Sequence, residues 1–267
     1  MLSSVLLKSL RDLRRPFAWW ALGLAGYVAM IVSVYPTIRG NRELEELMDQ
    51  YPDALKALFA FGGQLDFTSP AGYLGGELFS FMIPALFLVA AVGNGAGAIA
   101  GEEERGTLDL LLATPVSRRR VALHKLAAMC VEVVGLGLVL WLCLWVGGAV
   151  IDMNISAGHL AAASASSVLL TIVYGAVAFM LGAGTGRKGI AIGVTIAAAV
   201  AAYLVNSLAG LVDALKVPQK LSPFYHYATG DPLRHGLDLP HSLLLLAAAA
   251  AAAAVGILLF DRRDVSS

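Results

Sequence analysis

The apolar residues of this chain fall into six long blocks, which polar or turn-forming segments separate. Blocks of this length with few internal charges are typical of helices that cross a lipid bilayer. The pattern therefore predicts an all-α integral membrane protein with six transmembrane helices in a single domain, residues 1–267. The expected spans are residues 17–35, 74–99, 121–150, 160–183, 190–212 and 243–260.

Residues 1–15 have a different pattern from the spans. One face of a helix over this segment carries the apolar residues Leu2, Val5, Leu6, Leu10 and Leu13. The basic residues Lys8, Arg11, Arg14 and Arg15 lie largely off it. Such a segment is typical of a helix that lies in the membrane interface, with its basic groups near anionic lipid headgroups. The sequence thus predicts an N-terminal amphipathic interfacial helix before the first span.

Two segments between spans are long enough to have structure of their own. Residues 41–60 repeat apolar side chains at steps of three and four, so they predict an amphipathic outer segment that Pro52 breaks into two short helices. Residues 213–241 contain several prolines and cannot form one continuous helix. Their aromatic residues suit an interfacial or re-entrant element.

Composition and charge narrow the class of protein further. The chain is 58% hydrophobic and 14% charged, with 19 Lys and Arg against 19 Asp and Glu. These values argue against a soluble domain, a disordered chain or a nucleic-acid-binding protein. When the N-terminus is placed inside, 13 of the 19 basic residues fall in the inner segments. The positive-inside rule then predicts a multi-pass protein of the cytoplasmic (inner) membrane, in contact with lipid, with both termini cytoplasmic.

The connection between the second and third spans, residues 101–118, differs from the others. An acidic cluster precedes a short helical stretch whose leucines lie on one side, and three arginines follow the proline that ends it. Carboxylates near a helix N-terminus complement its dipole. From the residues alone, this segment is either a docking element for a partner or a helix that packs on the bilayer surface.

This stretch resembles the signature of the ABC-2-type permeases, the membrane subunits of one class of ATP-binding-cassette transporter. The family has Gly-Lys a few residues further on, where this chain has His124-Lys125. The stretch Ser222-Pro223-Phe224-x-x-Tyr227 also resembles the segment before the last span of these permeases. The residues that match the first motif are Glu102, Glu104, Gly106, Thr107, Leu108, Asp109, Leu111, Leu112, Thr114, Pro115, Val116, Ser117 and Arg118.

The resemblance implies that residues 101–118 form a short cytoplasmic coupling helix, which sits in a groove of a separate ABC ATPase subunit. It also implies two ATPase copies, a second permease copy or a paralogue, and export of a solute by alternating access. ATP and Mg would bind in the partner subunit, and no cofactor would bind to this chain. The implied coupling residues are Glu102, Glu103, Glu104, Arg105, Gly106, Thr107, Leu108, Asp109, Leu111, Leu112, Thr114, Pro115 and Arg118.

The chain lacks the sequence of an ATP-binding loop. A P-loop has the pattern Gly-x-x-x-x-Gly-Lys-Ser/Thr, and the nearest approach here, residues 182–189, has the wrong spacing and no Ser/Thr after its lysine. Because these residues lie between the fourth and fifth spans, they predict a tight turn. We expect a permease subunit that is not an enzyme and has neither catalytic nor metal-binding residues.

Four polar residues inside the spans are candidates for a role within the membrane: Glu77, Asn94, Glu132 and Asn206. An unpaired carboxylate at the depth of Glu132 is costly, so it either faces the interior of the bundle or dimer or pairs with His124 or Lys125 near the inner headgroups. The two asparagines are expected to bond neighbouring helices. Glycines in the second and fourth spans are expected to let those helices approach closely.

Other functions compete with the permease interpretation. An intramembrane metalloenzyme could use His226, His235, His241, Asp231 and Asp238, although their spacing matches no metal motif. A secondary transporter would need more ionisable groups at mid-membrane than Glu132 alone. A non-transporting membrane anchor of an ATPase-linked assembly would keep the same docking segment, so the sequence does not separate it from a permease.

Overall fold

The computed structural model describes residues 2–41, 43, 46–47, 50–52, 55–57, 68–108 and 116–263. Within these ranges all regular structure is helical, and six helical stretches are long and apolar enough to cross a membrane. They are Val5–Ile38, Pro70–Gly97, Arg118–Val150, Ala157–Thr185, Lys188–Leu208 and Leu239–Arg262. The six predicted spans are therefore confirmed, and the protein is an all-α membrane protein.

The helices form one bundle around α9 (Ala157–Thr185). On one side α9 packs against α5 (Met82–Gly97), and on the other against α14 (Leu239–Arg262). The helix α8 (Arg118–Val150) lies between α9 and α1 (Leu2–Ile38), while α10 (Lys188–Leu208) packs on α9 and α5. Because α1 and α10 have few helical neighbours, most of their apolar surface is left for lipid.

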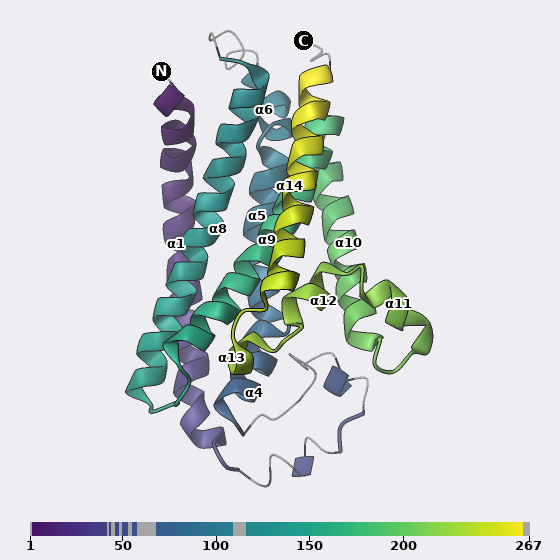
Figure 1. Cartoon of the computed structure of the whole chain (residues 1–267). Coiled ribbons are helices and arrows are strands. Elements are labelled where there is room, and N and C mark those ends of the chain that lie inside the picture. Colours follow the sequence, from purple (N-terminus) through teal and green to yellow (C-terminus); the bar gives the residue numbers. More distant parts are fainter. Residues whose placement is uncertain are drawn as a thin grey trace.

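The start of α1, the end of α14 and the short helix α6 (Ala100–Glu104) lie at one end of the bundle, which we call the α6 end (Figure 1). The short helices α4 (Pro70–Leu74) and α13 (Pro232–His235) lie at the opposite end, which we call the α13 end. This arrangement agrees with an even number of spans. It places the described first part of the connection, residues 101–108, at the same end as the first turns of α1 and the last turn of α14.

The expected separation between an interfacial helix and the first span is not found. Residues 2–15 are the first turns of α1, which continues through Pro16 without a break. A proline fixes a helical φ and removes only one backbone donor, a loss that membrane helices tolerate. Since Val5 and Ser9 are buried, this part of α1 packs against the bundle, where a separate helix on the bilayer surface was predicted.

Glycines allow the close approach of α5 and α9, as predicted. A Cβ atom on Gly95 would overlap the carbonyl oxygen of Gly175. A Cβ atom on Gly182 would lie 2.8 Å from the carbonyl oxygen of Ala96. At these positions any side chain would push the two helices apart, so the small residues set the spacing of the bundle centre.

The predicted tight turn between the fourth and fifth spans is also present. Gly186 ends α9 with φ +68° in the left-handed region, where glycine is favoured, and its N–H donates to the carbonyl oxygen of Gly182. The chain then enters α10 at Lys188, only two residues later. The turn brings the start of α10 to the α6 end, beside the connection between α5 and α8.

Short elements complete the α13 end. The second span begins with α4 and a π-helical turn, η1 (Gly75–Phe79), before α5. After α10 come η2 (Asp213–Leu215), α11 (Lys216–Gln219), α12 (Pro223–Ala228) and α13, so the prolines do divide this region into short helices. In the predicted outer segment 41–60, residues 46–47 and 55–57 are helical, and the Asn41 side chain accepts from the Glu43 N–H at 3.0 Å.

Candidate functional site

The acidic cluster at the α6 end makes its bonds inside the protein. Glu102 is buried, with 8% of its surface exposed. The Lys125 ammonium of α8 donates to Glu102 Oε1 at 2.6 Å, and the Thr107 hydroxyl donates to Glu102 Oε2 at 2.5 Å. The Arg105 guanidinium lies 3.4 Å from the same carboxylate. These contacts fix α6 against the first turns of α8.

The electrostatic environment of Glu102 favours its charged form. Burial alone raises the pKa of a carboxyl group, but the hydrogen bonds from Lys125 and Thr107 and the charges of Lys125 and Arg105 outweigh it. Together they lower the pKa of Glu102 to about 2. The carboxylate therefore stays ionised at neutral pH and holds its partners in place.

Glu103 connects the same segment to the last helix. Its carboxylate forms an ion pair with the guanidinium of Arg263, the residue that ends α14. The Arg118 guanidinium donates to the Arg263 carbonyl oxygen at 2.6 Å, and Arg119 pairs with Asp261 at 2.7 Å. These two contacts join the first turn of α8 to the last turn of α14.

Glu104 connects the segment to the fifth span. Its Oε1 accepts a hydrogen bond from the backbone N–H of Lys188 at 2.8 Å. Lys188 is the first residue of α10, whose N-terminal N–H groups carry the positive end of the helix dipole. Arg187, the N-cap residue of α10, makes no side-chain capping bond. The Glu104 carboxylate, which comes from another helix, caps α10 in its place.

The remaining coupling residues lie partly outside the described residues. Gly106 has φ +66°, and Leu108 is 2% exposed, so the chain turns back toward the bundle after α6. Arg118 begins α8 after Ser117, whose side chain makes no capping bond. The predicted residues Asp109, Leu111, Leu112, Thr114 and Pro115 lie outside the described residues. In the described part, the exposed residues of the segment are Glu104, Arg105, Gly106 and Ser117.

A polar cavity of about 190 Å³ opens beside this network. Charged residues line its outer part, and small or uncharged residues line the part nearer the bundle centre. The lining residues are Ser9, Asp12, Leu13, Gly93, Asn94, Gly97, Ala98, Glu102, Arg105, Lys125, Ala128, Met129 and Lys188. The cavity therefore joins the acidic segment to the polar residues inside the membrane.

Glu132 faces the interior of the bundle, one of the two alternatives predicted for it. It is 4% exposed, and its Oε2 accepts a hydrogen bond from the side-chain amide of Asn94 on α5. The alternative, a pair with His124 or Lys125, is wrong because Lys125 is engaged by Glu102, two turns nearer the α6 end. The other carboxylate oxygen, Oε1, is buried without a hydrogen-bond partner in the described part of the protein.

The other two intramembrane candidates lie at the α13 end and do not join this group. Glu77 is exposed in η1, where its backbone carbonyl accepts from the Tyr27 hydroxyl at 3.3 Å. Asn206 accepts from the side-chain amide of Gln219 on α11 at 3.2 Å. The prediction that both asparagines bond neighbouring helices is confirmed.

The stretch Ser222–Tyr227 has a structural role at the α13 end. Ser222 is the N-cap of α12, and its hydroxyl donates to the Ala202 carbonyl oxygen of α10 at 2.9 Å. The buried Tyr227 hydroxyl donates to the carbonyl oxygen of Phe79, before α5, at 2.7 Å. Sequence reasoning noted these residues but did not identify their partners, which come from distant spans.

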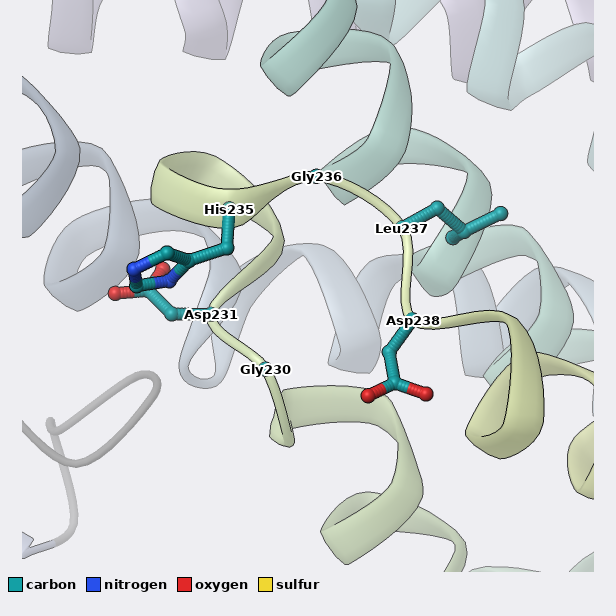
Figure 2. A pocket seen from close by; sticks show the side chains of 6 residues that line it. All are labelled: Gly230, Asp231, His235, Gly236, Leu237 and Asp238. Carbon is teal, nitrogen blue, oxygen red and sulfur yellow. The ribbon is translucent and has the colours of Figure 1, made fainter.

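The histidines and aspartates near α13 do not gather into a metal site. They border an open surface cavity of about 490 Å³, where the side chains of Asp231 and His235 lie together and that of Asp238 comes from the other side of the loop (Figure 2). Asp231 lies 3.5 Å from Arg234, and Asp238 accepts from the His241 N–H at 3.1 Å. Within the described ranges, no group of three His, Cys, Asp or Glu residues could hold a metal ion.

Comparison with known proteins identifies the family. Residues 2–261 match a family model described as "Multidrug efflux system permease Rv1217c, C-terminal domain". No curated protein gave a match. The matched residues cover nearly the whole chain and include all six apolar helices. The chain therefore belongs to the family of the multidrug efflux system permease Rv1217c, C-terminal domain, and is a multi-pass membrane protein of the transporter permease type.

Proposed function

We propose that this chain is the membrane subunit of an ABC exporter of the ABC-2 class, driven by ATP hydrolysis in a separate ATPase subunit. Two observations support the proposal. The family is described as a multidrug efflux system permease, which favours export of drug-like solutes. The segment from Glu102 to Arg118 carries the sequence motif of ABC-2 permeases, and its first residues belong to α6, at the α6 end of the bundle.

The observation that carries the proposal is the set of bonds that joins this segment to the spans. Glu102 binds α8, Glu103 binds the end of α14, and Glu104 binds the start of α10. A force applied to the segment between α5 and α8 therefore reaches α8, α10 and α14 directly through these bonds. In this mechanism the ATPase pulls the exposed part of the segment, and the three carboxylates pass the displacement to the bundle.

The proposed assembly contains two ATPase subunits, which bind ATP and Mg, and a second permease copy or a paralogue. We place the α6 end on the cytoplasmic side of the inner membrane. The lysines and arginines favour this orientation, because 13 of 19 fall in the segments assigned to that side. Both termini would then be cytoplasmic.

The test is a charge reversal at Asp109, the acidic residue of the motif that follows the three carboxylates. In membrane vesicles that contain the chain and its ATPase, Asp109→Lys is expected to abolish ATP-driven drug transport while the chain still inserts into the membrane. Asp213→Lys is the matched control, because Asp213 is an exposed acidic residue at the opposite end of α10. Glu102, Glu103 and Glu104 are less suitable, since their reversal would also break bonds within the bundle.

Transport and co-purification of the ATPase are measured together. Loss of both in Asp109→Lys, with both retained in Asp213→Lys, is the expected result. Normal transport in Asp109→Lys, or the absence of any ATPase bound to the wild-type chain, would contradict the coupling role of this segment.

A further inference from the structure

Behind the deep part of the cavity at the α6 end lies Glu132, a carboxyl group with no counter-ion among the described residues; Glu132 itself does not line the cavity. The pair of Glu132 and Asn94 lies where α8 and α5 face each other, and Asn94 lines the cavity. Ala128 and Met129, one helical turn before Glu132, line it as well. Because Glu132 is 4% exposed and its Oε1 has no partner within the described residues, the carboxylate is set up for a group that the protein itself does not supply.

The cations of the cavity do not neutralise Glu132. Lys125 and Arg105 both pair with Glu102, and Lys125 precedes Glu132 by seven residues, or about 10 Å along α8. Lys188 contacts Gly97 and Gly101, near the outer part of the cavity. The residues that line the deep part, such as Gly93, Asn94 and Met129, are uncharged.

The lining selects the kind of cation that could bind. The amide of Asn94 donates to Glu132, which leaves the amide carbonyl of Asn94 as an acceptor beside the free carboxylate oxygen. Two acceptors among glycine, alanine and methionine are too few for Mg²⁺ or Ca²⁺, which take six or more oxygen ligands. They suit an ammonium group that carries apolar substituents. A volume of about 190 Å³ admits this group but not a whole drug-sized molecule.

We propose that Glu132 and Asn94 form the recognition site for the positively charged group of an organic cation that this permease transports. That the cation is transported rests on the proposed function, whereas the binding site is supported independently by the cavity and the unpaired carboxylate. The cation enters from the α6 end, passes the ion pair of Glu102 and Lys125, and places its charge against the Asn94 side chain, beside the Glu132 carboxylate to which Asn94 is bonded.

Binding is tested on the purified full-length chain with radiolabelled tetraethylammonium. Saturable binding is expected, with displacement by choline but not by 3,3-dimethyl-1-butanol, which has the same shape without the charge. Glu132→Gln is expected to weaken binding about tenfold or more, because it removes the charge and keeps the shape. Glu132→Asp, which keeps the charge, should retain part of the binding. Glu77→Gln, an exposed carboxyl at the α13 end, is the matched control and should bind like the wild type.

Binding to the wild-type chain tests the site without relying on the folding of any variant. Three results would each overturn the site. They are absence of saturable binding, equal displacement by choline and the neutral alcohol, and equal binding by Glu132→Gln and the wild type when both elute alike in size-exclusion chromatography. The two proposals can fail separately. ATP-driven transport of other drugs without tetraethylammonium binding would refute this site alone, whereas binding without any ATP-driven transport would refute the exporter function alone.

Discussion

Replacement of Glu102 by glutamine measures how strongly the acidic segment is held by the bundle. The pKa of this carboxyl group falls from its ordinary value of 4.5 to about 2. At about 1.36 kcal/mol for each pH unit, the charged form stabilises the folded state by about 3 kcal/mol. Because the Glu102 side chain is 11% exposed and that of Lys125 is 17% exposed, solvent screens this pair little. Because glutamine keeps an acceptor for Lys125, we expect Glu102→Gln to lower the free energy of unfolding by about 2–3 kcal/mol.

The assay is unfolding of the detergent-purified chain, followed by tryptophan fluorescence at pH 7. Asp261→Asn is the control, because it removes the more exposed pair with Arg119 at the same end and should cost less than about 1 kcal/mol. The pH dependence has a definite sign. Since the folded pKa of Glu102 is lowered, its stabilisation is complete above about pH 4.5 and is lost as the pH falls toward 2. Equal stability of Glu102→Gln and the wild type at pH 7 would refute this reasoning.

Two further substitutions test the packing of the spans, and thermal unfolding measures both. Gly95→Ala should destabilise the bundle by about 1–3 kcal/mol, because its Cβ would overlap the Gly175 carbonyl oxygen, whereas Gly93→Ala, with open space around it, should be neutral. A neutral Gly95→Ala would contradict the close contact of α5 and α9. Tyr227→Phe should lower the free energy of unfolding by about 1–2 kcal/mol, because the buried Phe79 carbonyl loses the Tyr227 hydroxyl as a donor. Unchanged stability would show that this hydrogen bond does not stabilise the bundle.

Much of the fold follows from the sequence because a bilayer imposes simple rules. A segment that crosses hydrocarbon must be long, apolar and helical, so the six blocks predict the six spans, with ends that differ by at most four residues except at the start of the first span. Turn residues are also local signals, and Gly186 ends α9 where the glycine-rich stretch predicts a turn. The first helix shows the limit of this approach. The amphipathic pattern of residues 1–15, with its basic residues, suggested a separate helix, but the packing of Val5 and Ser9 favours one continuous helix.

The partners of the polar residues could not be predicted, because they depend on which helices become neighbours. The acidic cluster suggested a surface for another protein, yet Glu103 binds Arg263, which is 160 residues away in the sequence. Lys125 lies on the same helix as Glu132 but binds Glu102 of α6. With Lys125 engaged elsewhere, Glu132 has only the Asn94 amide within the described region, and this arrangement creates the candidate cation site.

The central claim is that this chain exports solutes with energy from a separate ATPase, and inverted membrane vesicles test it most directly. The vesicles contain the chain with its co-purifying ATPase, and the uptake of several fluorescent lipophilic drugs, neutral and cationic, is followed after ATP is added. The account predicts uptake that requires ATP, the chain and an ATPase with an intact P-loop lysine. Uptake that persists without ATP or with the inactive ATPase, or no uptake of any drug, would contradict it.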